Sequence, residues 1–423
     1  MKNTHLSYFI YALNALPLAL IVFPLFVFIG EHYSSSLGVS LLGIGIIFLL
    51  VRLLDGVLDP LVGLLSDKFN FWLGRRKFWL VISLPITTLS VWGLFAADVS
   101  GQFSIQYFSV NIVLLTIGLS LFGPPYYSLG AELSKEYLER SKIAFLREGF
   151  FLLGTISSAL IYALSDGSTE ALKNIALAVI ILHPITIFLS LFFVKESSEK
   201  NNIEGYIGFI NIFETIITER RVQKFLLSQF FNSAANGIPG ALFAFFVIHR
   251  LGREDLVGPL MLVYLISGVI GVPIWIFLGR FILKTRLWCF SICFSILIFF
   301  LVFFVGNNDV FLFIVICILT GLSVSADMAL PTSIQADLLD EDLKKTGSNR
   351  SGAFFSILSV INKTAAAVSG AFVLLFLYWV DFDPMGNNKD DTLFYLTCLY
   401  ALAPIILKIL PLFTMWSFKE EKN

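Results

Sequence analysis

The sequence is poor in charged residues and in cysteine, and it has no excess of positive charge. Only 14% of its 423 residues are charged, whereas soluble proteins carry about 25%. Because hydrophobic residues make up 57% of the chain and the mean hydropathy is +0.85, the composition excludes a soluble globular protein and indicates a polytopic membrane protein. A net charge of −1 provides no basic surface, so a nucleic-acid partner is not expected.

Residues typical of metal sites and of catalytic sites are also scarce. The cysteines lie in apolar segments without the further Cys or His residues that a metal site requires, so we expect small buried hydrophobic residues and predict no cofactor. These cysteines are Cys289, Cys293, Cys317 and Cys398. No His-rich cluster, Gly-x-Ser-x-Gly motif or repeated selectivity-filter segment is present, which argues against an intramembrane enzyme and against a channel.

Long apolar runs, in contrast, occur along the whole chain. A helix that spans a bilayer needs about 20 mostly apolar residues, and on this basis the sequence predicts twelve transmembrane helices. They lie near residues 7–30, 37–66, 78–97, 104–133, 147–166, 172–194, 223–249, 256–279, 286–306, 309–335, 351–380 and 391–416. The predicted fold class is therefore an all-α polytopic membrane protein.

Lys and Arg residues are distributed unequally among the predicted loops. If both termini are cytoplasmic, the cytoplasmic loops collect most of these residues, including Lys68 and Arg350. The opposite loops then receive Lys173, Arg250, Arg253 and Lys389. By the positive-inside rule, both termini of this multi-pass protein are predicted to be cytoplasmic. The compact chain with short loops favours a bacterial inner membrane.

The most polar internal segment, residues 195–204, follows the sixth predicted helix. We therefore predict an N-terminal six-helix half over 1–194, a cytoplasmic linker over 195–222 and a C-terminal six-helix half over 223–423. Within the linker, residues 206–217 are expected to form an interfacial helix along the membrane. The loops at 63–77 and 279–286 are similar and occupy the same place in the two halves, which indicates an internal repeat.

Three charged residues interrupt the second apolar segment. Arg52, Asp55 and Asp59 are spaced at i, i+3 and i+7, so they share one face of a helix. An ionised group at mid-bilayer costs at least ~2.5 kcal/mol, so such residues are functional by default. One arginine cannot neutralise two carboxylates, and the pair suits a Na⁺ or H⁺ site. The alternative is an Arg52–Asp55 salt bridge that only holds helices together.

Several stretches resemble a known family. Gly63-Leu-Leu-Ser-Asp67-Lys68 followed by Gly74-Arg75-Arg76-Lys77 resembles the signature loop of the major facilitator superfamily. Arg52-Leu-Leu-Asp55-Gly-Val-Leu-Asp59-Pro60 resembles the second helix of its glycoside–pentoside–hexuronide:cation symporters, the melibiose-carrier-like family. Residues 125–132 and 336–363 are similar to that family's fourth helix and tenth-to-eleventh-helix region. The resemblance implies a major-facilitator fold in two pseudo-symmetric halves and cation-coupled symport of a sugar or glycoside by alternating access.

The resemblance also implies roles for particular residues. It makes Asp55, Asp59 and Ser120 the cation site, with H⁺ or Na⁺ as the coupling ion. It places Tyr127 where a ring stacks on the sugar and Arg147 where an arginine lines the substrate cavity. Lys363 matches a lysine close to the cation site. Partners are then the bilayer, a small solute and the cation, and the protein is expected to be monomeric.

The sequence departs from this family where the sugar is bound. Leu16 and Gly123 stand where the family has acids that hold sugar hydroxyls, and neither side chain can accept a hydrogen bond. Leu58 replaces an asparagine beside the cation site, which favours H⁺ because Na⁺ prefers more oxygen ligands. The departures remove the specific galactoside prediction, and an apolar face around Leu13, Leu16 and Pro17 would suit the acyl chain of a lysophospholipid. A lipid-like solute is therefore the alternative substrate.

Other polar residues within the apolar segments are further candidates. Asp327 needs a partner, for which Lys363 is expected, and this pair either binds substrate or forms a fixed bridge. Asn14 and Asn236 lie beside prolines in the corresponding first helices of the two halves and are predicted to contact substrate. Lys408 is expected to extend towards the cytoplasm and to be structural.

Charged residues near the cytoplasmic side are predicted to act in gating or in structure. Glu132 is expected to form a gating salt bridge with Arg147 and Glu148 at the cavity mouth. The remaining members of this predicted group are Arg52, Asp67, Arg75 and Arg76. Asn362 is expected to face away from Lys363, and His183 is expected to serve packing alone.

Overall fold

The computed structural model describes residues 2–69, 71–97, 104–134, 137–196, 219–346, 351–386 and 388–418, and within these ranges nearly all regular structure is helical. The chain divides into two compact units, Met1–Glu199 and Lys200–Asn423. The division falls inside the predicted linker, and the interfacial helix expected at 206–217 lies outside the described residues.

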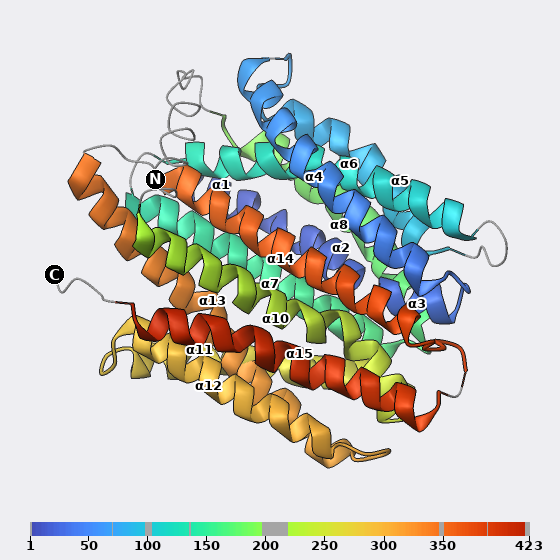
Figure 1. Ribbon diagram of the computed structural model, residues 1–423. Coiled ribbons are helices and arrows are strands. Elements are labelled where there is room, and N and C mark those ends of the chain that lie inside the picture. The colour runs from blue at the N-terminus through green and yellow to red at the C-terminus, as the bar shows by residue number, and fades with distance from the viewer. Residues whose placement is uncertain are drawn as a thin grey trace. The chain divides into compact units, whose positions relative to one another are not determined.

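The first unit consists of long helices joined by short connections (Figure 1). They are α1 (Lys2–Leu13), α2 (Ala15–Val27), α3 (Ile29–Ser35), α4 (Leu41–Lys68), α5 (Lys77–Phe95), α6 (Ser104–Glu132), α7 (Tyr137–Leu164) and α8 (Ser168–Phe193). The first three of these elements follow one another closely and replace the single helix predicted over 7–30. The predicted helix at 104–133 agrees closely with α6.

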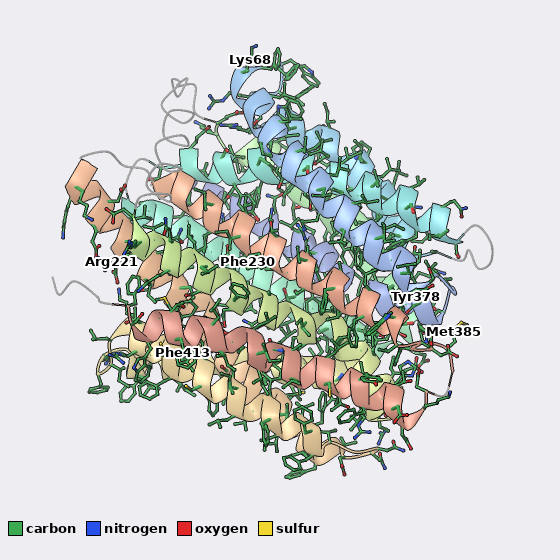
Figure 2. The ribbon with its side chains drawn as sticks, viewed as in Figure 1. Lys68, Arg221, Phe230, Tyr378, Met385 and Phe413 are labelled. Atoms are coloured by element: carbon green, nitrogen blue, oxygen red, sulfur yellow. The ribbon has the colours of Figure 1, made fainter. Side chains whose placement is uncertain are left out.

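The second unit repeats this plan of long helices. It contains α10 (Arg220–Phe245) with the π-helical turn η1 (Phe246–Arg250), the short η2 (Glu254–Leu256), α11 (Val257–Leu278), α12 (Lys284–Leu301), η3 (Val302–Phe304), α13 (Val310–Thr346), α14 (Ser351–Trp379) and α15 (Asp390–Trp416). Arg221 lies at one end of this unit, whereas Tyr378 and Met385 lie at the other (Figure 2).

In the part of the chain that the structure describes, 11 helical segments are long and apolar enough to cross a membrane. The helix α7 is not among them, because its N-terminal turns carry charged residues such as Glu139 and Lys142. It begins at Tyr137 rather than near 147, and α13 continues to Thr346 rather than ending near 335. Hydropathy reveals only the apolar part of a helix, so polar turns beyond the bilayer were missed at both places.

The break in the first span has a local cause. Pro17 has no backbone N–H, so it cannot donate the helical hydrogen bond to Leu13, where α1 ends. At the junction, Asn14 Nδ2 donates to the carbonyl oxygens of Ile10 at 3.2 Å and of Tyr11 at 3.1 Å. The side chain thus satisfies acceptors that the interrupted helix leaves open.

Corresponding helix pairs in the two units pack through glycine. A Cβ atom at Gly154 of α7 would lie 2.4 Å from the carbonyl oxygen of Leu16 in α2. A Cβ atom at Gly237 of α10 would lie 2.4 Å from Ser369 Oγ in α14. These pairs join the first and fifth spans of each unit, so both units use a small residue to bring two helix backbones together.

Candidate functional site

The charged cluster predicted on the second span is present on α4. Arg52 Nη1 lies 3.0 Å from Asp55 Oδ2, and the two side chains are 17% and 24% exposed. The Arg52 guanidinium also lies 5.7 Å from the centre of the Phe26 ring in α2. On the neighbouring helix α6, Ser120 Oγ lies 3.5 Å from Asp55 Oδ1. Asp59 is half-buried two turns from Arg52 on the same face of α4.

This arrangement contains both features that the sequence left open. The Arg52–Asp55 salt bridge exists, and it engages one oxygen of Asp55. The other oxygen lies near the Ser120 hydroxyl, and Asp59 brings a second carboxylate for one arginine. The group can therefore offer carboxylate and hydroxyl oxygens to a small cation. Among the described residues, no cluster of three or more His, Cys, Asp or Glu side chains could hold a metal ion.

A cavity of about 110 Å³ lies in the first unit beside this cluster's helices. It is lined by Ala15, Leu18, Tyr126, Tyr127, Arg147, Glu148 and Phe151. The Arg147 guanidinium lies 4.8 Å from the centre of the Tyr127 ring, and Arg147 Nη2 lies 2.6 Å from Glu148 Oε1. Two residues that the resemblance implied as substrate contacts, Tyr127 and Arg147, thus line one cavity together, with an apolar wall opposite the guanidinium.

Asn14 lies behind this region rather than on the cavity wall. Its residue surface is 1% exposed, and its Nδ2 atom donates to Ser190 Oγ of α8 at 2.7 Å. The contact joins the first and sixth spans of the first unit. His183 on the same helix α8 is also buried, and its ring lies 5.3 Å from that of Phe122.

The expected salt bridge between Glu132 and Arg147 is replaced by a different network. Glu132 Oε1 accepts hydrogen bonds from Arg75 Nη2 at 2.8 Å and from Arg76 Nη2 at 3.0 Å. Arg76 Nη1 also donates to Ser66 Oγ at 2.6 Å. Because α6 ends at Glu132, its carboxylate lies beside the loop between α4 and α5, whereas Arg147 lies inside α7 at the cavity. Arg75 and Arg76 are thus structural charges as predicted, while the side chain of Asp67 lies outside the described atoms.

The second unit has ion pairs at the corresponding end. Lys284 Nζ lies 2.7 Å from Asp337 Oδ2, which joins the start of α12 to α13. Arg221 at the start of α10 pairs with Glu341 near the end of α13. As in the first unit, basic residues before the third span thus meet an acid near the end of the fourth.

Asp327 has a different partner from the one expected. Lys408 Nζ of α15 lies 3.0 Å from Asp327 Oδ2, with side chains 1% and 4% exposed. The Lys363 partner expected for Asp327 was therefore wrong, and so was the expected extension of Lys408 towards the cytoplasm. The helix α15 lies beside α10 and directs Lys408 into the unit, whereas Lys363 on α14 is exposed (Figure 1).

Three further side chains complete this buried cluster. Asn236 Nδ2 donates to Asp327 Oδ2 at 3.0 Å, and Trp288 Nε1 donates to Asp327 Oδ1 at 3.0 Å. Lys408 Nζ donates to Asn232 Oδ1 at 2.9 Å. The sequence analysis missed Trp288 and the role of Lys408, although a lone lysine deep in an apolar span was a signal equal to that of Asp327.

A second polar cluster was also missed. Asn362 Oδ1 on α14 accepts hydrogen bonds from Gln229 Nε2 at 3.0 Å and from Ser233 Oγ at 2.8 Å, both on α10. The spacing of Gln229, Ser233 and Asn236 at i, i+4 and i+7 was the available signal, because it places three polar side chains on one face of a helix.

Comparisons with known proteins agree on one class. The model of the MFS/sugar transport protein family matches residues 10–422. The sodium-dependent lysophosphatidylcholine symporter 1 of Xenopus tropicalis is 24% identical over 421 residues, which cover 88% of this chain and 79% of that protein. The putative glycoside/cation symporter YagG of Escherichia coli strain K12 is 22% identical over 385 residues, which cover 89% of this chain and 83% of that protein. The crystal structure of the nucleoside transporter NupG has a TM-score of 0.70 at 15% identity and covers 97% of this chain and 99% of that chain.

Proposed function

Because the chain belongs to the MFS/sugar transport protein family, we propose that it is a secondary active transporter that couples a cation gradient to uptake of a small organic solute. Family membership and the likeness to NupG establish the predicted all-α major-facilitator fold and an integral, multi-pass membrane protein. Transport proceeds by alternating access, and both termini face the cytoplasm of a bacterial inner membrane. The protein acts as a monomer and needs no organic cofactor.

The observation that carries the proposal is the pair of carboxylates within an apolar span. Asp55 and Asp59 share a helix face with one arginine, and that arginine pairs with Asp55 alone among the printed ion pairs of the described residues. A cation bound to Asp59 and to the free oxygen of Asp55 neutralises the cluster within the membrane. The gradient supplies ~2.3 kcal/mol per charge per 100 mV.

The coupling ion is a proton in this proposal. Na⁺ needs several oxygen ligands, whereas the Arg52 guanidinium engages one carboxylate oxygen and Leu58 replaces the family's asparagine. The name of the Xenopus relative, which is sodium-dependent, favours Na⁺ as the alternative. Uptake under an imposed gradient of each ion separates the two.

The solute in this proposal is a sugar or glycoside that contacts Tyr127 and Arg147. The ring offers an apolar face for stacking, and the guanidinium offers hydrogen-bond donors to hydroxyl or anionic oxygens. A lysophospholipid is the second candidate, because the same cavity places the Arg147 guanidinium beside the apolar Leu18 and Phe151. An arginine next to an apolar wall suits a phosphate with an attached acyl chain.

Uptake into reconstituted vesicles tests the proposal. A labelled sugar panel and labelled lysophosphatidylcholine are each offered under an imposed H⁺ or Na⁺ gradient. Asp59→Asn should abolish gradient-driven accumulation, because the amide cannot bind the cation, while the purified variant keeps its thermal stability. The matched control is Asp391→Asn at the exposed start of α15, which should accumulate solute normally. Accumulation by Asp59→Asn at the wild-type level would refute the assignment of the cation site.

A further inference from the structure

The second unit contains an ion pair that is excluded from water and joined to four helices. Asp327 of α13 pairs with Lys408 of α15, and Trp288 of α12 and Asn232 and Asn236 of α10 donate to or accept from this pair. Neither the family nor the resemblance assigned a role to Lys408 or Trp288. The pair therefore calls for an explanation of its own, because a buried ion pair costs desolvation.

The hydrogen bonds around Asp327 form a closed set. Its Oδ1 atom accepts from Trp288, and its Oδ2 atom accepts from Lys408 and from Asn236. Both oxygens are thus occupied, and the side chain is 4% exposed. A carboxylate engaged in this way has no free oxygen to offer to a solute, so Asp327 does not itself contact the transported molecule.

The charge of Asp327 fixes the orientation of Asn236. An ionised carboxylate can only accept hydrogen bonds, so the Asn236 amide must turn its Nδ2 atom towards Asp327. Its carbonyl oxygen, Oδ1, then points away from the pair. Asn236 is also the half-buried member of the cluster, whereas Asn232 is 1% exposed and Asp327 is 7% exposed. Among the described residues, Asn236 makes no other hydrogen bond, so its carbonyl oxygen is a free acceptor at the partly exposed edge.

We propose that Lys408 and Asp327 are positioning residues, which hold the Asn236 carbonyl oxygen as an acceptor for a hydroxyl or N–H donor of the transported solute. The proposal rests on the transport function proposed above and adds a polarity to it. In this subsite the protein accepts a hydrogen bond, whereas Arg147 in the first unit donates. Hydroxyl groups of a sugar, or the single free hydroxyl of a lysophospholipid, supply the required donor.

The corresponding contact in the first unit lacks this arrangement. There, Asn14 at the first span donates to Ser190 of the sixth span, with no charged residue at that contact. Asn14 is 1% exposed, so its amide faces the interior and is not presented to a solute. The ion pair in the second unit is thus tied to an asparagine that is partly accessible.

The orientation of Asn236 can be tested without any solute, from the thermal unfolding of the purified full-length protein in detergent. Asn236→Asp places two carboxylates together, and we expect its Tm to fall by several degrees. In the exchanged variant Asn236→Asp/Asp327→Asn, one acid and one amide are restored beside Lys408, and we expect at least half of that loss to be recovered. The matched control is Asn362→Asp. Because Asn362 uses its oxygen as an acceptor, this variant should lose clearly less stability than Asn236→Asp.

Equal losses for Asn236→Asp and Asn362→Asp, or no recovery in the exchanged variant, would overturn the proposed orientation. The role in transport is tested with Asn236→Leu, for which labelled melibiose and labelled lysophosphatidylcholine are the probes. We expect KM to rise about five- to tenfold for the transported probe, with Vmax within twofold of wild type. An unchanged KM would refute the solute contact. If the wild type takes up neither probe, the proposed solute class fails, while the unfolding experiment still decides the orientation.

Discussion

Replacement of Gly154 by alanine tests how closely α7 and α2 approach each other. A methyl group at this position would lie 2.4 Å from the Leu16 carbonyl oxygen and 2.8 Å from Ala19 Cβ. The Leu16 oxygen belongs to the backbone, so no side-chain rotation relieves the contact, and the helices must separate. Overpacking of this kind costs ~1–3 kcal/mol. Alanine favours a helix over glycine by about 1 kcal/mol, which offsets part of that cost.

The chain offers a matched control on the same helix. A Cβ atom at Gly149 would meet no atom within 4 Å, so Gly149→Ala gains the helix preference without the steric cost. We expect the free energy of unfolding of the two variants to differ by ~1–3 kcal/mol, with Gly154→Ala the less stable. In a thermal unfolding assay this corresponds to a Tm lower by roughly 2–6 °C. If Gly154→Ala unfolds at the same temperature as Gly149→Ala, or above it, the close approach of the two helices is refuted.

Two further predictions concern charge and pH. Glu132→Gln removes the charge that Arg75 and Arg76 share, so we expect a loss of about 1.5–3 kcal/mol. The control Glu139→Gln disturbs only an exposed pair and should cost less than ~1 kcal/mol, and equal Tm values for the two variants would contradict the importance of the network. Burial lowers the pKa of His32 from 6.5 to about 4, so the folded protein resists protonation more than the unfolded chain. Stability should therefore be complete above pH 6.5 and fall between pH 6.5 and 4, by up to roughly 3 kcal/mol from this residue. Tm measured from pH 7.5 to 4.5 should fall less for His32→Gln, and identical slopes would contradict the assignment.

The positions of the helices and of the charged cluster on α4 could be predicted from the sequence. Hydropathy located α6 to within a residue or two, because a span of this length needs apolar residues throughout. The i, i+3, i+7 spacing of Arg52, Asp55 and Asp59 fixed their common face for any helix. The meeting of Tyr127 and Arg147 came from the resemblance and not from spacing, since they lie on different helices.

The partners of Asp327 and Glu132 could not be predicted in this way. Lys363 and Lys408 are equally plausible partners in the sequence, and the choice depends on how α15 is rotated about its axis. A helix that is apolar on nearly every face carries little periodicity from which that rotation could be read. For Glu132, proximity in the chain to Arg147 was a poor guide, because the loop residues Arg75 and Arg76 return to the end of α6.

The Asp327–Lys408 pair has a consequence for how this sequence can change over generations. Loss of either residue alone leaves an unpaired charge among apolar helices, which costs far more than loss of both. The two positions therefore form a barrier to single-step mutation, and a lineage leaves this state by a double change or through a weakened intermediate. The neutral contact between Asn14 and Ser190 in the first unit imposes no such restriction, so two halves of common plan are unequally free to diverge.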